Sequence, residues 1–239
     1  MIVTPNLVFV HVPRTGGTFV RKTLEGHLAV DPNAPSLATH APYRDLDRRF
    51  RDRPGFYVVR NPWDWYVSWY HYLLARGPVL ANTPVPTSKK EVPPSKKLLE
   101  KRARLRAKQA TWTEVFGSGR ASFREVVTGA CSGTISLVEA EDLHESGLDL
   151  YSYFVWDLTE RDAEPGNLEV VRYESLRSSL QGFLERRGFR EKCLHDAIAH
   201  DPPLNASDHR SYRSYYDAEL RDLVQHRAGA LIERHGYTF

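Results

Sequence analysis

A short segment near the N-terminus has the composition of an anion-binding loop. It follows the apolar run at residues 7–12 and precedes a stretch with helical periodicity. Glycines let the backbone approach an anion closely, and amides at the start of a helix point toward it. Hydroxyl groups and a guanidinium would add further donors. The segment predicts a metal-free site for a phosphate-like group, made by Arg14, Thr15, Gly16, Gly17, Thr18 and Phe19.

This loop by itself also admits other interpretations. Its glycines could serve only the geometry of a strand-to-helix turn. A kinase-type phosphate loop requires the pattern G-x-x-x-x-G-K-[ST], in which the hydroxyl residue after the lysine binds Mg²⁺. That pattern is absent from the sequence, which counts against ATP or GTP hydrolysis. A P-loop-like nucleotide kinase and a non-catalytic nucleotide-binding module are kept as alternatives.

A second segment, at residues 57–68, offers a second phosphate contact. Arg60 ends the apolar run at residues 56–59, and Pro62 stands where a first-turn helix proline belongs. Ser68 follows two helical turns later, so Arg60 and Ser68 are predicted to bind one phosphate group. Asp64 is expected to serve the helix N-terminus or to orient Arg60. The alternative is a buried aromatic helix preceded by a surface arginine.

Together these two segments resemble those of sulfotransferases that use 3′-phosphoadenosine-5′-phosphosulfate (PAPS). The first, at residues 13–18, is similar to their 5′-phosphosulfate loop, and Arg60 to Ser68 to their 3′-phosphate segment. Val171-Arg172-Tyr173-Glu174 resembles a third landmark, a strand end whose tyrosine lies near the adenine. The stretch with Arg210, Ser211 and Tyr212 resembles the loop that closes over the nucleotide.

The resemblance covers most of the chain except about residues 77–110 and 130–165, and it is nearer the carbohydrate-modifying and bacterial branch. It implies transfer of the sulfuryl group of PAPS to an acceptor hydroxyl, with an amine as second choice, and adenosine 3′,5′-bisphosphate as product. No metal is expected. The chain departs from the family at Arg14, where a lysine is usual. Arginine can stabilise charge there but is a poor proton donor, so the expected role of Arg14 is electrostatic.

Removal of the acceptor proton requires a base, and His40 is our candidate. Histidine suits this role because its ordinary pKa is about 6.5. His40 lies between the two phosphate segments, and in the carbohydrate-modifying relatives a histidine in a similar position acts as base. The alternative is a structural or substrate-orienting histidine. His11 is expected to orient the loop, and His71 and His209 are weaker candidates.

The elements that must position these residues alternate between strand and helix. Such alternation indicates an α/β fold with a central parallel sheet flanked by helices, in which ligands gather at the carboxyl ends of the strands. The resemblance implies the P-loop NTPase-like sulfotransferase fold in a single domain, residues 1–239. The predicted strands are residues 7–12, 56–59 and 168–172, and the predicted helices are residues 19–28, 63–75, 123–128, 175–187, 191–200 and 217–234.

Residues 77–110 break this pattern with five prolines and then a basic run, and they predict a mobile insertion, helical or loop-like, that acts as a lid. Such a lid would attract an acidic acceptor, for example an anionic saccharide, lipid or peptide. The alternative is a solvated helix face. The basic residues are Lys89, Lys90, Lys96, Lys97, Lys101, Arg102, Arg104, Arg106 and Lys108.

The composition agrees with a small-molecule enzyme. With 239 residues, 41% of them hydrophobic, the chain can bury a substantial core. A net charge of +3 suits an anionic ligand without requiring nucleic acid. No stretch approaches 18 apolar residues, and the two cysteines lack metal or disulfide-scaffold spacing. We therefore expect a cytoplasmic protein with no membrane span.

Overall fold

The computed structural model of the chain describes residues 1–81, 121–134, 143, 145–161, 168–204 and 209–239. The chain forms two compact units. The first comprises Met1–Trp65, Tyr151–Asp208 and Ala230–Phe239, and the second Tyr66–Leu150 and His209–Gly229. Helix α3 (Pro62–Ala81) contributes to both. Most of the predicted basic insertion, from residue 82 to its end near residue 110, lies outside the described residues.

The first unit is built on a four-stranded open sheet in the order β1-β2-β3-β4. Strands β2 (Val8–Val10), β3 (Gly55–Val59) and β4 (Leu168–Arg172) are parallel, which confirms an α/β fold with a mostly parallel sheet. The sequence did not predict β1 (Ile2–Val3), which pairs antiparallel with β2. Two residues are too short for a periodicity signal. A tight turn sets the pairing, because Thr4 Oγ1 accepts from the Leu7 amide at 3.0 Å.

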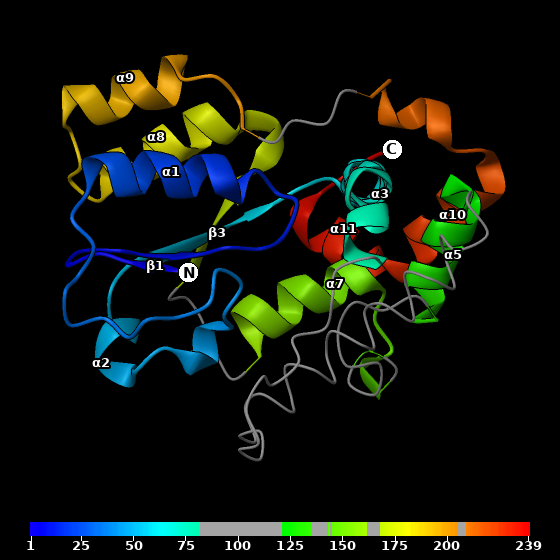
Figure 1. Cartoon of the computed structure of the whole chain (residues 1–239), viewed down its shortest axis with the longest axis horizontal. Helices are drawn as coiled ribbons and strands as arrows, with labels where there is room; N and C mark the ends of the chain where they lie inside the picture. Colours follow the sequence, from blue (N-terminus) through cyan, green and yellow to red (C-terminus); the bar gives the residue numbers. More distant parts are fainter. Residues whose placement is uncertain (82–120, 135–142, 144, 162–167, 205–208) are drawn as a thin grey trace, which may run out of the picture. The chain divides into compact units, whose positions relative to one another are not determined.

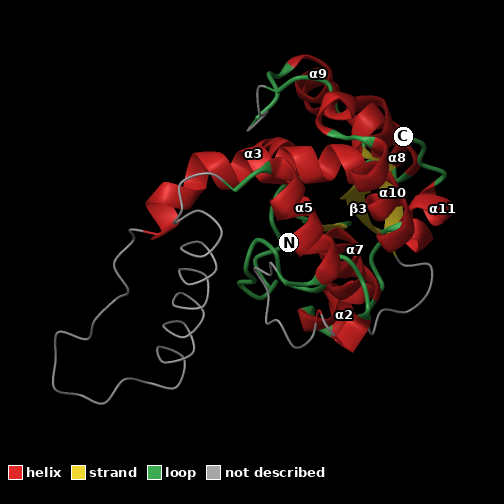
Figure 2. Ribbon diagram, turned by 90° about the vertical axis from the view of Figure 1, so that its right-hand side faces the viewer, coloured by secondary structure: helices red, strands yellow, loops and turns green. Residues whose placement is uncertain are grey.

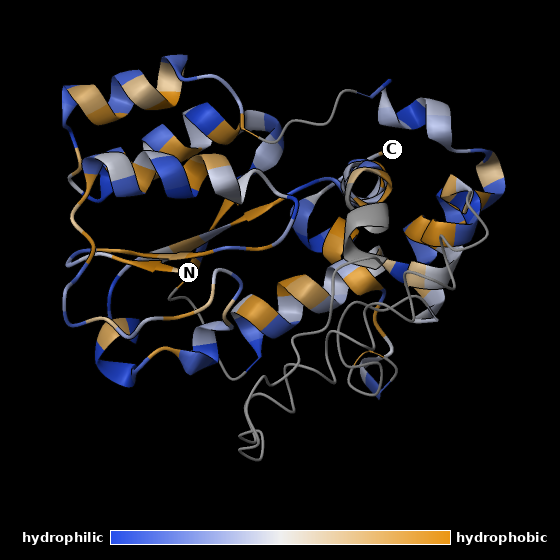
Figure 3. Cartoon of the chain, in the orientation of Figure 1, coloured by the Kyte–Doolittle hydropathy of each residue, from blue (hydrophilic) through white to orange (hydrophobic). Residues whose placement is uncertain are grey.

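Helices cover both faces of this sheet. On one side lie α1 (Gly17–His27), α8 (Leu176–Arg186) and α9 (Lys192–His200), and α2 (Arg48–Arg51) lies on the other (Figures 1 and 2). Strands β2 and β3 are hydrophobic along their length, whereas the helices show apolar and polar faces (Figure 3). Buried strands of a parallel sheet require this pattern, and the edge strand β4 departs from it with Glu169 and Arg172.

Aromatic side chains link the sheet to α8. The ring of Phe56 lies 4.9 Å from that of Phe9 and 4.6 Å from that of Phe183, measured between centroids. All three are fully buried, together with Leu24, Val58 and Leu184. This core fixes β2 and β3 against the helical layer, and thereby the loops that leave their carboxyl ends.

Several boundaries differ from those predicted. The predicted helix at residues 217–234 is two helices, α10 (Ala218–Arg227) and α11 (Gly229–His235), because the chain breaks at Ala228. The next residue, Gly229, has low helix propensity, so a break beside it costs little free energy. Helix α3 runs to Ala81, past the predicted end near residue 75. Residues 43–51, for which no element was predicted, contain the turn η1 (Tyr43–Asp45) and α2, which Asp47 caps by accepting from the Arg49 amide at 3.2 Å.

A further helical segment was not predicted. Helix α7 (Leu150–Val155) runs directly into a π-helical turn, η2 (Trp156–Glu160). Its tyrosine Tyr151 is fully buried and contacts the end of β3. The segment thus helps to fix the position at which β3 ends.

The second unit is helical in its described part. Helix α5 (Phe123–Ser132) begins with a capping box formed by Ser122 and Glu125, and it packs on α10. The Phe123 ring contacts Tyr70 of α3 and Tyr215 of the turn η4 (Tyr212–Tyr215). None of the helices within the described ranges is long and apolar enough to cross a membrane.

Candidate functional site

Three of the residues singled out in the sequence directly follow the three parallel strands. His11 follows β2, Arg60 follows β3 and Tyr173 follows β4. The register pairs Val59 with Arg172, so Arg60 and Tyr173 leave neighbouring strands at the same level. Parallel sheets bind ligands at this edge. The first unit therefore brings the predicted loop, Arg60 and Tyr173 together.

The loop between β2 and α1 has an unusual backbone. Arg14 adopts a left-handed conformation with φ of 61°, and Gly16 does so with φ of 82°. A left-handed conformation is uncommon for a residue with a side chain and often marks a functional turn. Turns that alternate in this way form backbone concavities that bind anions.

The hydrogen bonds of this loop leave a set of amides for an external acceptor. The Pro13 carbonyl accepts from Trp65 Nε1 at 2.8 Å, and the Arg14 carbonyl accepts from Arg60 Nη1 at 3.2 Å. Within the described part of the chain, the amides of Gly16, Gly17 and Thr18 have no acceptor. They lie at the start of α1, where the helix dipole favours negative charge.

Two of the predicted donors already have partners in the protein. The Thr15 hydroxyl donates to the Val12 carbonyl at 2.9 Å, and Thr15 is fully buried. The Phe19 amide donates to the Gly16 carbonyl at 3.0 Å. Thr18, in contrast, is exposed. Among these residues Thr18 is thus the exposed donor, whereas Gly16 is half-buried and Gly17 is buried.

The two glycines allow close packing of other side chains against the loop. A Cβ atom on Gly17 would lie 2.0 Å from Cδ2 and 2.2 Å from Nε2 of His11. One on Gly16 would lie 2.9 Å from Leu176 Cδ2 and 3.1 Å from Tyr173 Cδ2. The contact at Gly17 is sterically impossible, and at Gly16 the tight contacts add to the left-handed φ, so both positions favour glycine. They bring His11 and Tyr173 directly against the loop.

Arg60 is the positive charge that the structure fixes most firmly beside the loop. Its Nε lies 2.7 Å from Asp64 Oδ2, so Asp64 orients Arg60, one of the two roles expected for it, and it also stands in the first turn of α3. Its Cζ lies 4.1 Å from the centroid of the Tyr173 ring, a cation–π distance. Only 7% of the Arg60 side chain is exposed. A charge held in this way needs little reorganisation on binding an anion.

The backbone at the end of β3 is fixed as well. Tyr151 donates to the Arg60 carbonyl at 3.0 Å, and its hydroxyl oxygen accepts from the Arg60 amide at 2.7 Å. The Tyr151 ring stacks on Trp65 at 4.6 Å, the same tryptophan that holds the Pro13 carbonyl. Burial raises the pKa of Tyr151 well above its ordinary value, so it stays a neutral donor. The sequence held no signal for these contacts, because they join segments far apart in the chain.

His40 lies against His11 and has a defined tautomer. Its Nδ1 is 2.9 Å from the His11 carbonyl oxygen, and the ring centroids are 4.5 Å apart. A carbonyl oxygen only accepts, so Nδ1 carries the proton and the lone pair of neutral His40 is on Nε2. The His40 ring is exposed, whereas His11 is 5% exposed. This arrangement suits a general base that receives a proton at Nε2.

The buried His11 is held in its neutral form. Burial first, and then the neighbouring His40, lower the pKa of His11 to about 3. Its Nδ1 is buried and has no hydrogen-bond partner within the described ranges. His11 therefore adds no positive charge beside His40 near neutral pH.

The other predicted ligand-binding residues belong to the second unit. Ser68 is 2% exposed and follows Asp64 by four residues in α3, which places both on one helix face. Arg210 and Ser211 are exposed and Tyr212 is half-buried, just before and within η4. Their roles in nucleotide binding remain predictions. In the same unit, His71 Nε2 lies 2.8 Å from the Tyr215 hydroxyl, and its ring stacks on that of His209.

Comparison of the chain with protein-family models, with curated proteins and with solved structures gives no match. No family is therefore assigned. The loop, Arg60 and His40, with the motifs that they form, are the features of the chain that bear on its function.

Gly17→Ala is expected to destabilise the protein, because the new methyl group would collide with the His11 ring. Overpacking of this kind costs about 1–3 kcal/mol of unfolding free energy. Gly26→Ala, in the same helix, is the matched control: a Cβ there meets nothing within 4 Å. Removing that helical glycine is expected to stabilise by about 0.5–1 kcal/mol. Urea unfolding measures the unfolding free energy of both variants. Equal values would contradict the close contact between Gly17 and His11.

His11 makes stability dependent on pH. Below pH 6.5 the unfolded chain binds a proton at His11 that the folded chain, with its pKa near 3, does not. Stability therefore falls with falling pH over this window, by up to about 1.4 kcal/mol per pH unit. His11→Phe should reduce this slope, because phenylalanine does not bind a proton. His27→Phe, at an exposed position of α1, is the control. An unchanged slope in His11→Phe would refute the neutral buried state.

Proposed function

We propose that the chain is a sulfotransferase that uses PAPS and has the P-loop-like fold of that family. The observation that supports this most directly is the loop at residues 13–18, where three amides at the start of α1 lack an acceptor within the described residues and Arg60 is fixed alongside. Anionic groups of a phosphosulfate are suitable acceptors for such donors.

The residues present fit such a ligand in charge and in donor type. The amides of Gly16, Gly17 and Thr18 and the Thr18 hydroxyl would hold the 5′-phosphosulfate. Arg60, and Ser68 by the motif resemblance, would hold the 3′-phosphate. The Tyr173 ring lies against both Gly16 and Arg60. An adenosine that contacts this ring would therefore lie directly beside the phosphate groups. Arg210, Ser211 and Tyr212 would close over the nucleotide.

The reaction forms a bond between the acceptor oxygen and sulfur, and breaks the bond from sulfur to the 5′-phosphate oxygen, leaving adenosine 3′,5′-bisphosphate. His40 accepts the acceptor proton at Nε2 while its Nδ1 keeps its own proton and donates it to the His11 carbonyl in a hydrogen bond. The loop amides stabilise the negative charge that grows on the leaving phosphate. Arg14 contributes positive charge there and keeps its own proton.

Nucleotide selectivity tests the proposal. In a thermal-shift titration, adenosine 3′,5′-bisphosphate should raise the melting temperature without metal, because ligands that bind only the native state stabilise it. ATP with Mg²⁺ should have a smaller effect, and stabilisation by ATP with Mg²⁺ alone would instead favour the kinase alternative. Arg60→Ala should weaken binding of the bisphosphate at least tenfold. Arg49→Ala, an exposed arginine of α2, should not.

His40 is tested by separating turnover from binding. Loss of a general base lowers turnover by about 10²–10⁴-fold, so His40→Ala should reduce kcat at least a hundredfold. It should leave the affinity for adenosine 3′,5′-bisphosphate within about twofold. His27→Ala provides the control for an exposed histidine. Unchanged turnover in His40→Ala would exclude His40 as the base.

A further inference from the structure

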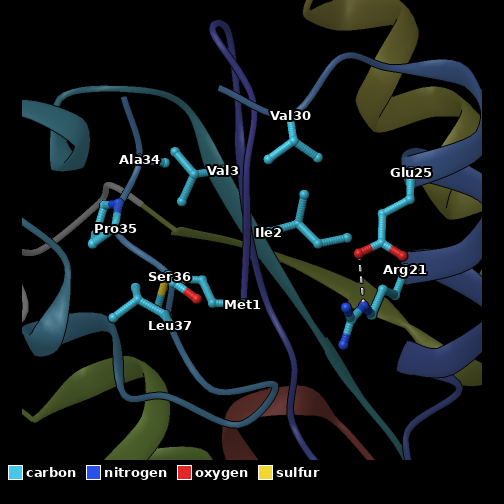
Figure 4. A pocket seen from close by; sticks show the side chains of 10 residues that line it. All are labelled: Met1, Ile2, Val3, Arg21, Glu25, Val30, Ala34, Pro35, Ser36 and Leu37. Atoms are coloured by element: carbon cyan, nitrogen blue, oxygen red, sulfur yellow. Dashed lines mark hydrogen bonds and ion pairs between the residues drawn. The ribbon is translucent and has the colours of Figure 1, made fainter. Parts of the chain in front are cut away.

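A pocket opens on the first unit beside strand β1, and none of the proposed nucleotide-binding residues lines it. Its volume is about 320 Å³, within the range of small-molecule sites. One wall is the pair Arg21 and Glu25 of α1, and the opposite wall is the segment from Ala34 to Leu37 (Figure 4). Between them lie Met1, Ile2, Val3 and Val30.

The pocket is connected to His40 through the residue that precedes it. Arg21 Nη1 donates to Thr39 Oγ1 at 2.8 Å, and the Met1 amine donates to the Thr39 carbonyl at 2.5 Å. Two pocket residues therefore bind the residue next to His40. The strand register places the pocket near the same end of the sheet: Ile2 pairs with Phe9, so Met1 lies toward the end of β2 that leads into His11.

The lining combines apolar side chains with one ion pair. Ile2 and Val3, each 4% exposed, lie between the two walls together with Val30, and the wall from Ala34 to Leu37 adds further apolar side chains. The Arg21 guanidinium is paired with Glu25, its Nε lying 2.8 Å from Oε1. Burial lowers the pKa of the Met1 amine to about 6, so this group is mostly neutral at pH 7. An anion would find no excess positive charge here, and its desolvation would go uncompensated.

We propose that this pocket holds the acceptor, and that the acceptor is a neutral alcohol with an apolar body. The apolar body would lie on Ile2, Val3 and Val30, and its hydroxyl would extend past Thr39 to Nε2 of His40. This inference rests on the proposed sulfotransferase function. It differs from the acidic acceptor expected from the basic run at residues 89–108, which lies outside the described residues.

A matched pair of probes separates the two acceptor classes. Naphthalene-2-methanol is a neutral fluorescent alcohol, and 6-(hydroxymethyl)naphthalene-2-carboxylate has the same ring and hydroxymethyl group with a negative charge. Binding of each to the full chain is measured by fluorescence without nucleotide, so no turnover is needed. The neutral alcohol is expected to bind at least fivefold more tightly than the carboxylate.

Val30→Trp is designed to fill the pocket. Val30 is 51% exposed, so a larger side chain should be tolerated. Val170→Trp is the matched control, since Val170 is 40% exposed but belongs to β4, at the opposite edge of the sheet from β1. Val30→Trp should weaken binding of naphthalene-2-methanol at least tenfold, and Val170→Trp should leave it unchanged. Ala34→Phe provides a second pocket-filling variant if Val30→Trp does not fold.

The outcomes distinguish this inference from the proposed function. If adenosine 3′,5′-bisphosphate binds but the pocket-filling variants keep full affinity for the neutral alcohol, the acceptor pocket is refuted and the sulfotransferase proposal stands. Tighter binding of the carboxylate would refute the neutral acceptor. If the bisphosphate does not bind, the proposed function fails, and selective alcohol binding would then identify only an alcohol-binding site.

Discussion

Two hydrogen bonds from the β3–α3 segment to the loop after β2 hold the candidate site together. Trp65 and Arg60 donate to the carbonyls of Pro13 and Arg14. These bonds fix the path of the loop just before α1, whose first amides, like those of any helix, have no acceptor within the helix. The same two donors are positioned by Asp64 and Tyr151, so the shape of the loop depends on residues that follow another strand.

The two histidines lie together but in different surroundings. His11 is buried and its pKa is low, whereas His40 is exposed and donates its Nδ1 proton to the His11 carbonyl in a hydrogen bond. The neutral His11 ring adds no positive charge beside the exposed imidazole of His40. Packing of His11 against Gly17 fixes this arrangement relative to α1, so His40 and the loop share one structural support.

Sequence reasoning succeeded where a feature is local. Strand β4 matches the predicted residues 168–172, where Val170 and Val171 stand before the turn into the next helix. The nearness of the loop to Arg60, and one of the two roles expected for Asp64, followed from strand ends and spacing. It failed where the feature depends on contacts across the fold: the two-residue strand β1, the contact of Tyr151 with Arg60, and the pocket beside β1 all join segments distant in sequence. No local pattern encodes such contacts.

At Arg14 the backbone conformation and the chemistry of the side chain are two independent requirements. The turn demands φ of 61° from whatever residue stands there, and arginine and lysine meet that demand equally, since neither is branched at Cβ. Exchange of one for the other thus alters the chemistry of the side chain while the path of the chain stays the same. Position 14 is therefore a place where a proton-donating and a purely electrostatic group can be compared on one unchanged scaffold.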